Sequence, residues 1–195
     1  METPSNEEQS LIGRAQRGDL PAYESLVRQY EQVAFRAAYL ITRDADEAAD
    51  AAQDGFLRAY RALGSFRVGQ PFRPWLLRIV TNLALNRLKA DQRRAHMTER
   101  YTRQIVVEAG NPSIDGLVAR REQSEHLLQA VSKLAPDQQT LIALRYFLEL
   151  PESEVAATLK IPPGTVKSRL HRTLARLREI IQREFPDLIE LTTNG

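Results

Sequence analysis

The 195-residue chain is long enough for one large domain or two small ones, and its 43% hydrophobic and 27% charged residues are ordinary for a soluble globular protein. It contains no cysteine, which excludes disulfides, thiolate zinc sites and thiol redox switches. No apolar run is long enough to span a membrane and the N-terminus is polar and acidic, so we expect no membrane insertion, no signal peptide and a cytoplasmic location.

Apolar residues recur at helical spacing along almost the whole chain, and strand-like alternation is nearly absent, so the sequence predicts an all-α fold. The first strongly periodic segment predicts a helix over residues 20–41. A second helix is expected over 44–63, with an apolar stripe at six positions: Ala48, Ala51, Ala52, Phe56, Leu57 and Tyr60. A third helix opens at Pro71 or Pro74, because proline is comfortable in the first turn of a helix and poor later.

The helical pattern fades after residue 91, and the run Gly110-Asn111-Pro112-Ser113 is a strong breaker. The run 104–107 is the one candidate strand, and we discount it. Helical pattern resumes at Glu122, breaks at Pro136, and continues through three segments: 137–148, 151–159 and 161–179. We therefore expect two small helical domains, 1–94 and 122–186, joined by a flexible linker (95–121) and followed by a tail (187–195).

The net charge of +2 hides an uneven distribution of charge. Acidic residues are absent from 55–90 and from 155–178, which carry seven and six Lys or Arg residues respectively. A cluster of acids precedes the first of these segments: Asp44, Asp46, Glu47, Asp50 and Asp54. Two acid-free basic segments indicate two anionic contacts, and solvated surface is the alternative for each.

The segment 161–179 reads IPPGTVKSRLHRTLARLRE and predicts a basic amphipathic helix. Its apolar positions form a single stripe: Val166, Leu170, Leu174, Leu177 and Ile181. Polar and basic residues occupy the other side: Thr165, Ser168, Arg169, Arg172 and Arg176. A short helix and a turn of about four residues precede it, so the pattern predicts a helix-turn-helix whose second helix enters the major groove. A solvated surface helix is the alternative.

The string Pro162-Pro163-Gly164-Thr165-Val166-Lys167-Ser168-Arg169 resembles the DNA-binding region 4 of extracytoplasmic-function (ECF) sigma factors, the smallest sigma subunits of bacterial RNA polymerase. The resemblance extends back through Leu134-Ala135-Pro136, Leu144-Arg145-Tyr146 and Glu154-Val155-Ala156. It implies contacts with the −35 promoter element by eight residues: Arg145, Thr165, Lys167, Ser168, Arg169, His171, Arg172 and Arg176. For His171, a flank position in solvent is equally open. This half alone also fits a response-regulator type activator.

The N-terminal half resembles the same family. The run Gln53-Asp54-Gly55-Phe56-Leu57-Arg58-Ala59-Tyr60 is similar to the region 2.2 helix. It implies docking on the coiled coil of the polymerase β′ subunit through five residues: Glu47, Asp50, Gln53, Asp54 and Arg58. An exposed acidic face suits a basic protein partner. The alternative is an ordinary acidic first turn that is favoured by the helix dipole.

Residues 72–84 read FRPWLLRIVTNLA and are similar to regions 2.3 and 2.4 of the family. The resemblance implies capture of the −10 strand, with the loop 64–70 forming a pocket for an unstacked base. Eight residues are implied in this contact: Ser65, Phe66, Arg67, Arg73, Arg78, Asn82, Asn86 and Arg87. Trp75 fits either the core or a base platform, with the core the commoner fate of such a residue, and Phe66 and Phe72 carry the same ambiguity.

Three positions depart from the family pattern. Ala49 replaces one acid of region 2.2, and Gly55 lies in the middle of the predicted helix, where it costs about 1 kcal/mol against alanine. Weaker or tuned polymerase binding is the expected consequence. Pro151 stands where the family often has a serine or threonine N-cap.

The sequence thus predicts an ECF-type sigma factor that binds core polymerase, recognises −10 and −35 elements and directs transcription initiation. The resemblance also implies a contact between the polymerase β flap and the surface near Leu144 and Phe147, a linker in the RNA-exit path, and a possible anti-sigma factor. We expect no enzyme activity, cofactor or metal, because the three histidines lack metal spacing and no nucleophile or phosphate-loop motif is present. A stand-alone helix-turn-helix regulator is the alternative, and a helical adaptor is the third interpretation.

Overall fold

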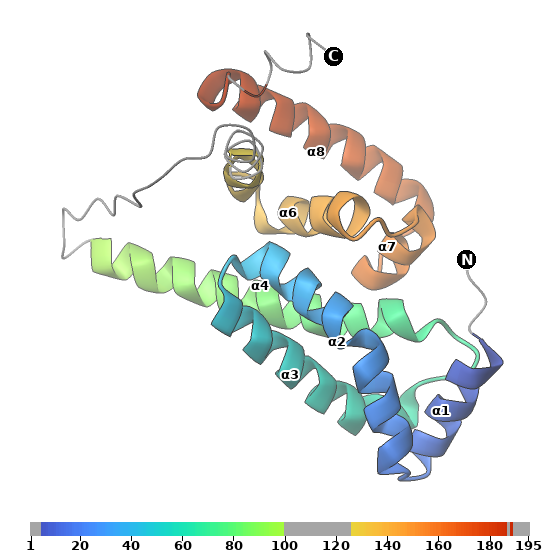
Figure 1. Cartoon of the computed structure of the whole chain (residues 1–195). Helices are drawn as coiled ribbons and strands as arrows, with labels where there is room; N and C mark the ends of the chain where they lie inside the picture. Colours follow the sequence, from blue (N-terminus) through green and yellow to red (C-terminus); the bar gives the residue numbers. More distant parts are fainter. Residues whose placement is uncertain (1–4, 100–125, 187, 189–195) are drawn as a thin grey trace, which may run out of the picture.

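The computed structural model describes residues 5–99, 126–186 and 188, and every regular element within these ranges is helical (Figure 1). The labelled elements are α1 (Asn6–Gln16), α2 (Leu20–Thr42), α3 (Ala45–Ala62), the 3-10 turn η1 (Leu63–Ser65), α4 (Phe72–Glu99), α6 (Pro136–Ile142), the π-helical turn η2 (Ala143–Phe147), α7 (Glu152–Leu159) and α8 (Pro163–Glu184). Residues 126–132 form a further short helix before α6. The expected all-α fold is confirmed for this part of the chain.

Helices α1 to α4 form the N-terminal domain. Its core takes apolar side chains from all four helices, among them Ile12, Leu26, Ala34, Ala48, Phe56, Phe72 and Leu76. The stripe expected on α3 is correct at its alanines and at Phe56, but wrong at Leu57 and Tyr60, which are 51% and 37% exposed. Gly55 and Ala59 take the buried positions instead, because they lie on the side of α3 that faces its neighbours.

Gly55 is buried on the side of α3 that packs against α4. A Cβ atom added to Gly55 would lie 2.5 Å from Cγ2 of Val80 on α4, far inside van der Waals contact. The sequence indicated only a cost in helix propensity at this position. The structure adds a packing reason for the glycine, since the absence of a side chain lets the two helices meet.

Helix α1 was not predicted, although its start carries a capping signal. The Glu8 backbone N–H donates to Ser5 Oγ at 3.1 Å, and the Ser-x-x-Glu spacing of a capping box runs from Ser5 to Glu8. The buried Glu8 carboxylate accepts a hydrogen bond from the Tyr30 hydroxyl at 2.5 Å. Burial raises the pKa of the Tyr30 phenol, and this hydrogen bond raises it further. Tyr30 therefore stays protonated and ties α1 to α2.

Helix α4 continues to Glu99 and so passes the domain boundary expected at residue 94. Apolar periodicity fades from residue 91, and so it does not mark the end of this helix. The discounted strand at 104–107 and the linker residues 100–121 lie outside the described residues.

The C-terminal domain packs the helix 126–132, α6, η2, α7 and α8 together. The buried side of α8 carries Val166, Leu170, Thr173, Leu177 and Ile180. The predicted stripe is therefore wrong at Leu174, which is 39% exposed, and at Ile181, which is only half-buried. Steps of four, three, four and three stay on one helical face, so Thr173 and Ile180 turn inward. The short helix α7 and the turn before α8 match the expected helix-turn-helix.

The two domains are in contact, with α6 and α7 between α8 and the N-terminal domain (Figure 1). Ala37 of α2 and Leu77 of α4 join a buried cluster with Leu144, Leu150 and Val155 from the C-terminal domain. None of the described helices is both long and apolar enough to cross a membrane. The described residues also contain no group of three or more His, Cys, Asp or Glu side chains that could hold a metal ion.

Candidate nucleic-acid and protein interfaces

The loop between η1 and α4 forms one wall of a small pocket. The pocket has a volume of about 260 Å³ and is lined by Ser65, Phe66, Arg67, Gln70, Pro71, Pro74, Trp75, Arg78 and Ala157. The Gln16 side chain fixes this loop, because its Nε2 donates to the Leu63 carbonyl at 2.9 Å and to the Phe66 carbonyl at 2.7 Å. The structure therefore brings together four of the residues expected to hold the −10 strand: Ser65, Phe66, Arg67 and Arg78.

Three aromatic side chains pack against one another at one wall of this pocket. The ring centroids of Phe66 and Trp75 are 4.8 Å apart, and Phe72 lies 5.6 Å from Phe66 and 5.4 Å from Trp75. Phe66 and Phe72 are buried, whereas Trp75 is half-buried and packs against the core while lining the pocket. The two interpretations of Trp75 are therefore compatible: one residue is both an edge of the core and a pocket wall.

Arg87 lies with the acidic residues of α3, although it was assigned to the −10 contact with Asn82 and Asn86. Its guanidinium lies 2.8 Å from Glu47, 3.0 Å from Asp54 and 3.4 Å from Asp50. The hydrogen bond to Glu47 is the largest cause that raises the pKa of Arg87.

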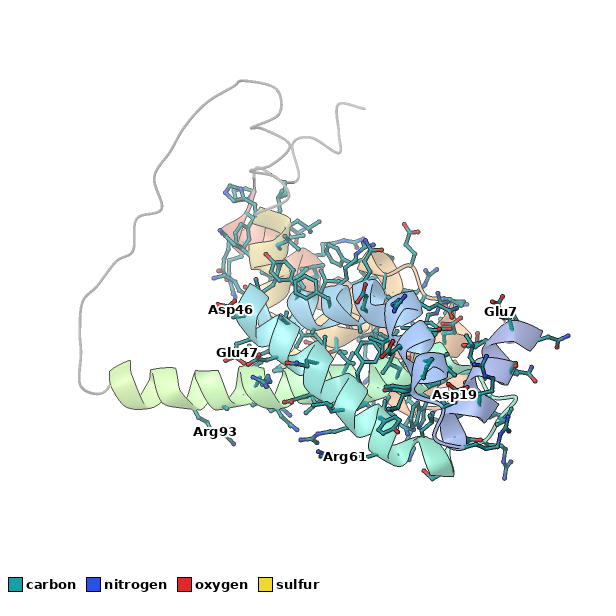
Figure 2. The ribbon with its side chains drawn as sticks, turned by 60° about the horizontal axis from the view of Figure 1, so that its bottom comes forward. Glu7, Asp19, Asp46, Glu47, Arg61 and Arg93 are labelled. Carbon is teal, nitrogen blue, oxygen red and sulfur yellow. The ribbon has the colours of Figure 1, made fainter. Side chains whose placement is uncertain are left out.

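The pairing follows from helix geometry, because positions 47, 50 and 54 share one face of α3 and that face looks toward α4. Figure 2 shows Glu47 at the start of α3 beside α4, with Arg93 further along α4. Asn82 and Asn86 are exposed on α4, so they stay open to a ligand. Arg87, which was expected to bind DNA, therefore forms ion pairs with three residues that were expected to bind polymerase.

An apolar groove runs between α2 and α3. Its volume is about 640 Å³, and it is lined by Leu20, Tyr23, Val27, Glu31, Phe35, Ala49, Asp50, Ala52, Gln53, Phe56, Leu57 and Tyr60. Leu57, Tyr60, Leu20 and Phe35 are all exposed there. The sequence interpretation missed this groove, because it placed Leu57 and Tyr60 in the core. Asp50 and Gln53, both expected to bind polymerase, lie on its lining, and Arg58 is exposed on the same helix.

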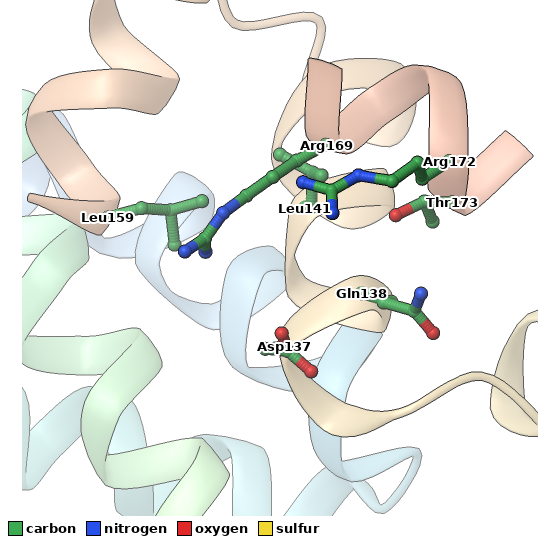
Figure 3. A pocket seen from close by; sticks show the side chains of 7 residues that line it. All are labelled: Asp137, Gln138, Leu141, Leu159, Arg169, Arg172 and Thr173. Atoms are coloured by element: carbon green, nitrogen blue, oxygen red, sulfur yellow. The ribbon is translucent and has the colours of Figure 1, made fainter. Parts of the chain in front are cut away.

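Helix α8 presents most of the residues expected at the −35 element to solvent. Lys167, Ser168, Arg169, His171, Arg172 and Arg176 are exposed, and Thr165 is half-buried. Arg169 and Arg172 line a pocket of about 290 Å³ with Asp137, Gln138, Leu141, Leu159 and Thr173 (Figure 3). Arg176 differs from the others because it pairs with Glu179 at 2.8 Å. Arg145 lies outside α8, over the Tyr146 ring at 5.7 Å.

Arg73, which was expected to contact the −10 strand, joins the two domains. Its Nε and Nη2 atoms lie 2.8 and 2.7 Å from the two carboxylate oxygens of Glu154 on α7. Leu144, expected to face the polymerase β flap, is 1% exposed and packed in the cluster between the domains. Phe147 is half-buried, and its carbonyl accepts a hydrogen bond from Arg36 of α2 at 3.3 Å.

Comparison with known proteins matches both domains to one family. Residues 26–94 match the family description "Sigma-70 region 2", and residues 124–177 match "Sigma-70, region 4". The ECF RNA polymerase sigma-E factor of Escherichia coli K12 is 33% identical over 192 residues, which cover 93% of this chain and 96% of the relative. The ECF sigma factor SigW of Bacillus subtilis is 32% identical over 91% and 96%. The sigma-H factor of Pseudomonas aeruginosa is 32% identical over 90% and 94%.

Two solved structures share the fold. CnrH, solved with the cytosolic domain of CnrY, superposes with a TM-score of 0.66 at 23% identity and covers 92% of this chain and 99% of its own. The sigma factor RpoE of Bartonella quintana, solved with the anti-sigma factor NepR, gives a TM-score of 0.59 at 21% identity over 83% and 98%. At these identities the likeness describes the arrangement of helices alone.

Proposed function

Because the chain belongs to the ECF sigma factors, we propose that it binds core RNA polymerase, recognises −10 and −35 promoter elements and directs transcription initiation. The observation that supports the proposal is the presence of two separate surfaces with exposed or partly exposed basic side chains, one on each domain: the pocket at Phe66 and Trp75, and the exposed basic side of α8. A stand-alone regulator would need only the second surface. We also propose that the protein works in the cytoplasm and that the polymerase, not this chain, carries out the chemistry.

The −35 element is assigned to the N-terminal half of α8. Helix-turn-helix proteins place the start of their second helix against base edges in the major groove. Lys167, Arg169 and Arg172 are exposed there without any acid on the same helix before Glu179. Arginine side chains can donate hydrogen bonds to both O6 and N7 of guanine, and lysine and serine side chains can donate to phosphate oxygens.

Replacing Arg172 by alanine is expected to weaken binding of a −35 duplex about tenfold, because a bidentate contact with a base edge is lost. The matched control is Arg183→Ala on the same helix, which lies roughly 16 Å further along the axis and pairs with Glu184. Fluorescence anisotropy with a labelled duplex measures both affinities. Equal affinities for the wild type and Arg172→Ala would remove Arg172 from the interface.

The −10 strand is assigned to the pocket at the η1–α4 loop. Single-stranded nucleic acid is held by basic side chains and by surfaces on which bases stack or insert. Arg67 and Arg78 supply the charge, and Ser65 and Gln70 supply hydrogen-bonding groups around the aromatic wall. Asn82 and Asn86 extend this polar surface along α4.

Core polymerase is assigned to the groove between α2 and α3 and to the acids beside it. Exposed Leu57 and Tyr60 offer apolar contact area, and Asp50 and Gln53 offer polar groups at the same surface. Interfaces commonly combine a desolvated apolar centre with a charged rim.

Replacing Leu57 by lysine is expected to weaken core binding about tenfold or more, since a charge would be placed in the centre of this contact. Leu127→Lys is the control, because Leu127 is similarly exposed but lies in the C-terminal domain. Titration of labelled protein with sigma-free core polymerase gives both dissociation constants. A normal constant for Leu57→Lys would move the polymerase contact away from the groove.

The proposal as a whole is tested by transcription with purified components. Sigma-free core polymerase is mixed with this protein and with genomic fragments, and the transcripts are sequenced. Discrete starts that share motifs near −10 and −35 are expected. Duplex binding by the free protein without any specific start would instead favour the stand-alone regulator. The same assay, with an added candidate protein, tests the proposed regulation by an anti-sigma factor.

A further inference from the structure

A pocket of the C-terminal domain carries side chains of both charge signs. Its volume of about 290 Å³ is close to the lower end for small-molecule sites, which begins at about 300 Å³. Arg169 and Arg172 of α8 line one side, and Asp137 and Gln138 of α6 line the other (Figure 3). The proposed −35 contact uses the two arginines but gives no role to the two residues of α6.

The opposite charges in this pocket do not neutralise one another. Within the described residues, Asp137, Arg169 and Arg172 form no ion pair with one another or with any other side chain. Arg176 on the same helix differs, because it pairs with Glu179 at 2.8 Å. An acid and two bases that line one pocket without contact leave space for a small molecule that carries both charges.

Thr173 provides a separate observation that points to a ligand. The residue is 2% exposed, and Figure 3 shows its hydroxyl oxygen turned into the pocket. This hydroxyl forms no hydrogen bond with the part of the chain that the structure describes. The buried Thr140 hydroxyl of the same domain, by contrast, donates to the Pro136 carbonyl at 2.9 Å. A buried polar side chain normally has a partner, so we expect Thr173 to bind an atom that enters the pocket.

The remaining lining residues define the other contacts of such a molecule. Gln138 Oε1 accepts a hydrogen bond from the Ala135 backbone N–H at 3.2 Å, which holds the side chain in place and leaves its Nε2 to face a ligand. Leu141 is 2% exposed and Leu159 is half-buried, and both lie on the lining. The pocket therefore offers donors to an anionic group, a carboxylate to a cationic group and a small apolar surface.

Charge decides between the classes of ligand. A phosphate would be attracted by the two arginines but repelled by Asp137, and a simple amine would meet the reverse. A zwitterion satisfies both sides, and charge-assisted hydrogen bonds are the stronger ones. We propose that this pocket binds a free α-amino acid with an apolar side chain, whose carboxylate contacts Arg169 and Arg172 and whose ammonium group contacts Asp137.

The bound amino acid competes with promoter DNA. This consequence rests on the proposed sigma function, because Arg169 and Arg172 are assigned there to the −35 element. A guanidinium that holds a carboxylate in the pocket is not available to a base edge, so the two ligands exclude each other. An amino acid at about ten times its dissociation constant would raise the apparent dissociation constant of a −35 duplex about tenfold.

Isothermal titration calorimetry of the full chain tests the pocket with four probes: L-leucine, N-acetyl-L-leucine, L-leucinamide and inorganic phosphate. The second probe lacks the ammonium group and the third lacks the carboxylate. L-leucine is expected to bind at least about tenfold more tightly than each of the others, because each of them loses a charged hydrogen bond. Absence of L-leucine binding would overturn the site. Equal binding of L-leucine and N-acetyl-L-leucine or phosphate would reduce it to a simple anion site and overturn the proposed ligand.

Two variants test whether L-leucine binds in this pocket. Asp137→Asn should weaken L-leucine about tenfold and leave N-acetyl-L-leucine unchanged, because only L-leucine has an ammonium group to lose a partner. Glu152→Gln is the matched control, since Glu152 is an exposed acid of the same domain outside the pocket. Thr173→Val removes the hydroxyl at similar size and should weaken L-leucine severalfold, with circular dichroism as the check of folding. Unchanged L-leucine affinity in both Asp137→Asn and Thr173→Val would overturn the assignment to this pocket.

Competition is measured by fluorescence anisotropy with a labelled −35 duplex. L-leucine at about ten times its dissociation constant should weaken duplex binding by the wild type about tenfold. The same concentration should have little effect on Asp137→Asn, which is not among the proposed DNA contacts and should still bind the duplex. L-leucinamide at the same concentration controls for ionic strength. Unchanged duplex binding in the presence of saturating L-leucine would overturn the competition.

This inference and the sigma function fail in different ways. The calorimetry contains neither polymerase nor DNA, so it decides whether the pocket binds an amino acid whatever the outcome of the transcription assay. If L-leucine binds but the protein never supports initiation, the sigma function is wrong and the pocket stands. If initiation proceeds and L-leucine does not bind, the function stands and the pocket carries no such ligand.

Discussion

Replacing Gly55 by alanine is expected to destabilise the protein by about 3 kcal/mol, near the upper end of overpacking costs. The new Cβ atom would lie 2.5 Å from Cγ2 of Val80. Val80 is fully buried, and a β-branched side chain on a helix has essentially one allowed rotamer, so the methyl group cannot turn away. The loss is expected in spite of a gain of about 1 kcal/mol in helix propensity. Urea denaturation measures it directly.

A rescue variant makes this prediction specific. Combining Gly55→Ala with Val80→Ala removes the clashing methyl group, so the double variant should lose less stability than the two single variants together. Gly64→Ala is the control, because a Cβ atom at that position would meet no packing neighbour from elsewhere in the described structure within 4 Å. Equal or greater stability of Gly55→Ala would mean that α3 and α4 can separate without cost.

Replacing Phe72 by alanine is expected to cost about 3–5 kcal/mol, as for other large aromatic side chains that are deleted from a core. Phe72 is 0% exposed, and its ring lies 5.4 Å from the rings of both Tyr30 and Trp75. The same change should weaken binding of −10 single strands, since Phe66 and Trp75 would lose the packing that holds the pocket wall. Denaturation and strand-binding titrations test the two effects separately.

The protein provides its own reporter for this change, because Trp75 is the sole tryptophan of the chain. A red-shifted emission from Phe72→Ala under native conditions would show that the aromatic cluster has loosened. Phe35→Ala is the control, since Phe35 is an exposed aromatic residue that stacks on Tyr39 in the same domain. It should cost less than about 1 kcal/mol. Equal losses for the two variants would contradict the assignment of Phe72 to the core.

The sequence was sufficient for the order and type of the elements from α2 onward, because helical periodicity is long and regular there. It was less informative about which side of a helix is covered. Leu57 and Tyr60 fit the stripe of α3 by spacing, yet they remain exposed because no helix in the described part of the chain packs over them. Periodicity gives the direction of an apolar face, but the partner that covers it is determined by tertiary packing.

Two further features were not predicted, for different reasons. The start of α1 carries a serine followed three residues later by a glutamate, a local signal that was present and overlooked. The pairing of Arg87 with Glu47 and Asp54 had no local signal at all, since the residues are far apart in the sequence. The same holds for Arg73 and Glu154, which lie in different domains. The roles of the individual site residues in polymerase and DNA binding remain predictions.

The hydrogen bonds from Gln16 to the loop at Leu63 and Phe66 have a consequence for how promoter preference can evolve. Helix α1 contributes no residue to the lining of the pocket proposed for the −10 strand, but Gln16 of α1 holds the backbone that shapes this pocket. If this pocket binds the −10 strand as proposed, variation at position 16 would change promoter preference while every side chain that lines the pocket stayed the same. Selection for a new promoter preference could then act on this helix as well as on the residues proposed to contact the bases.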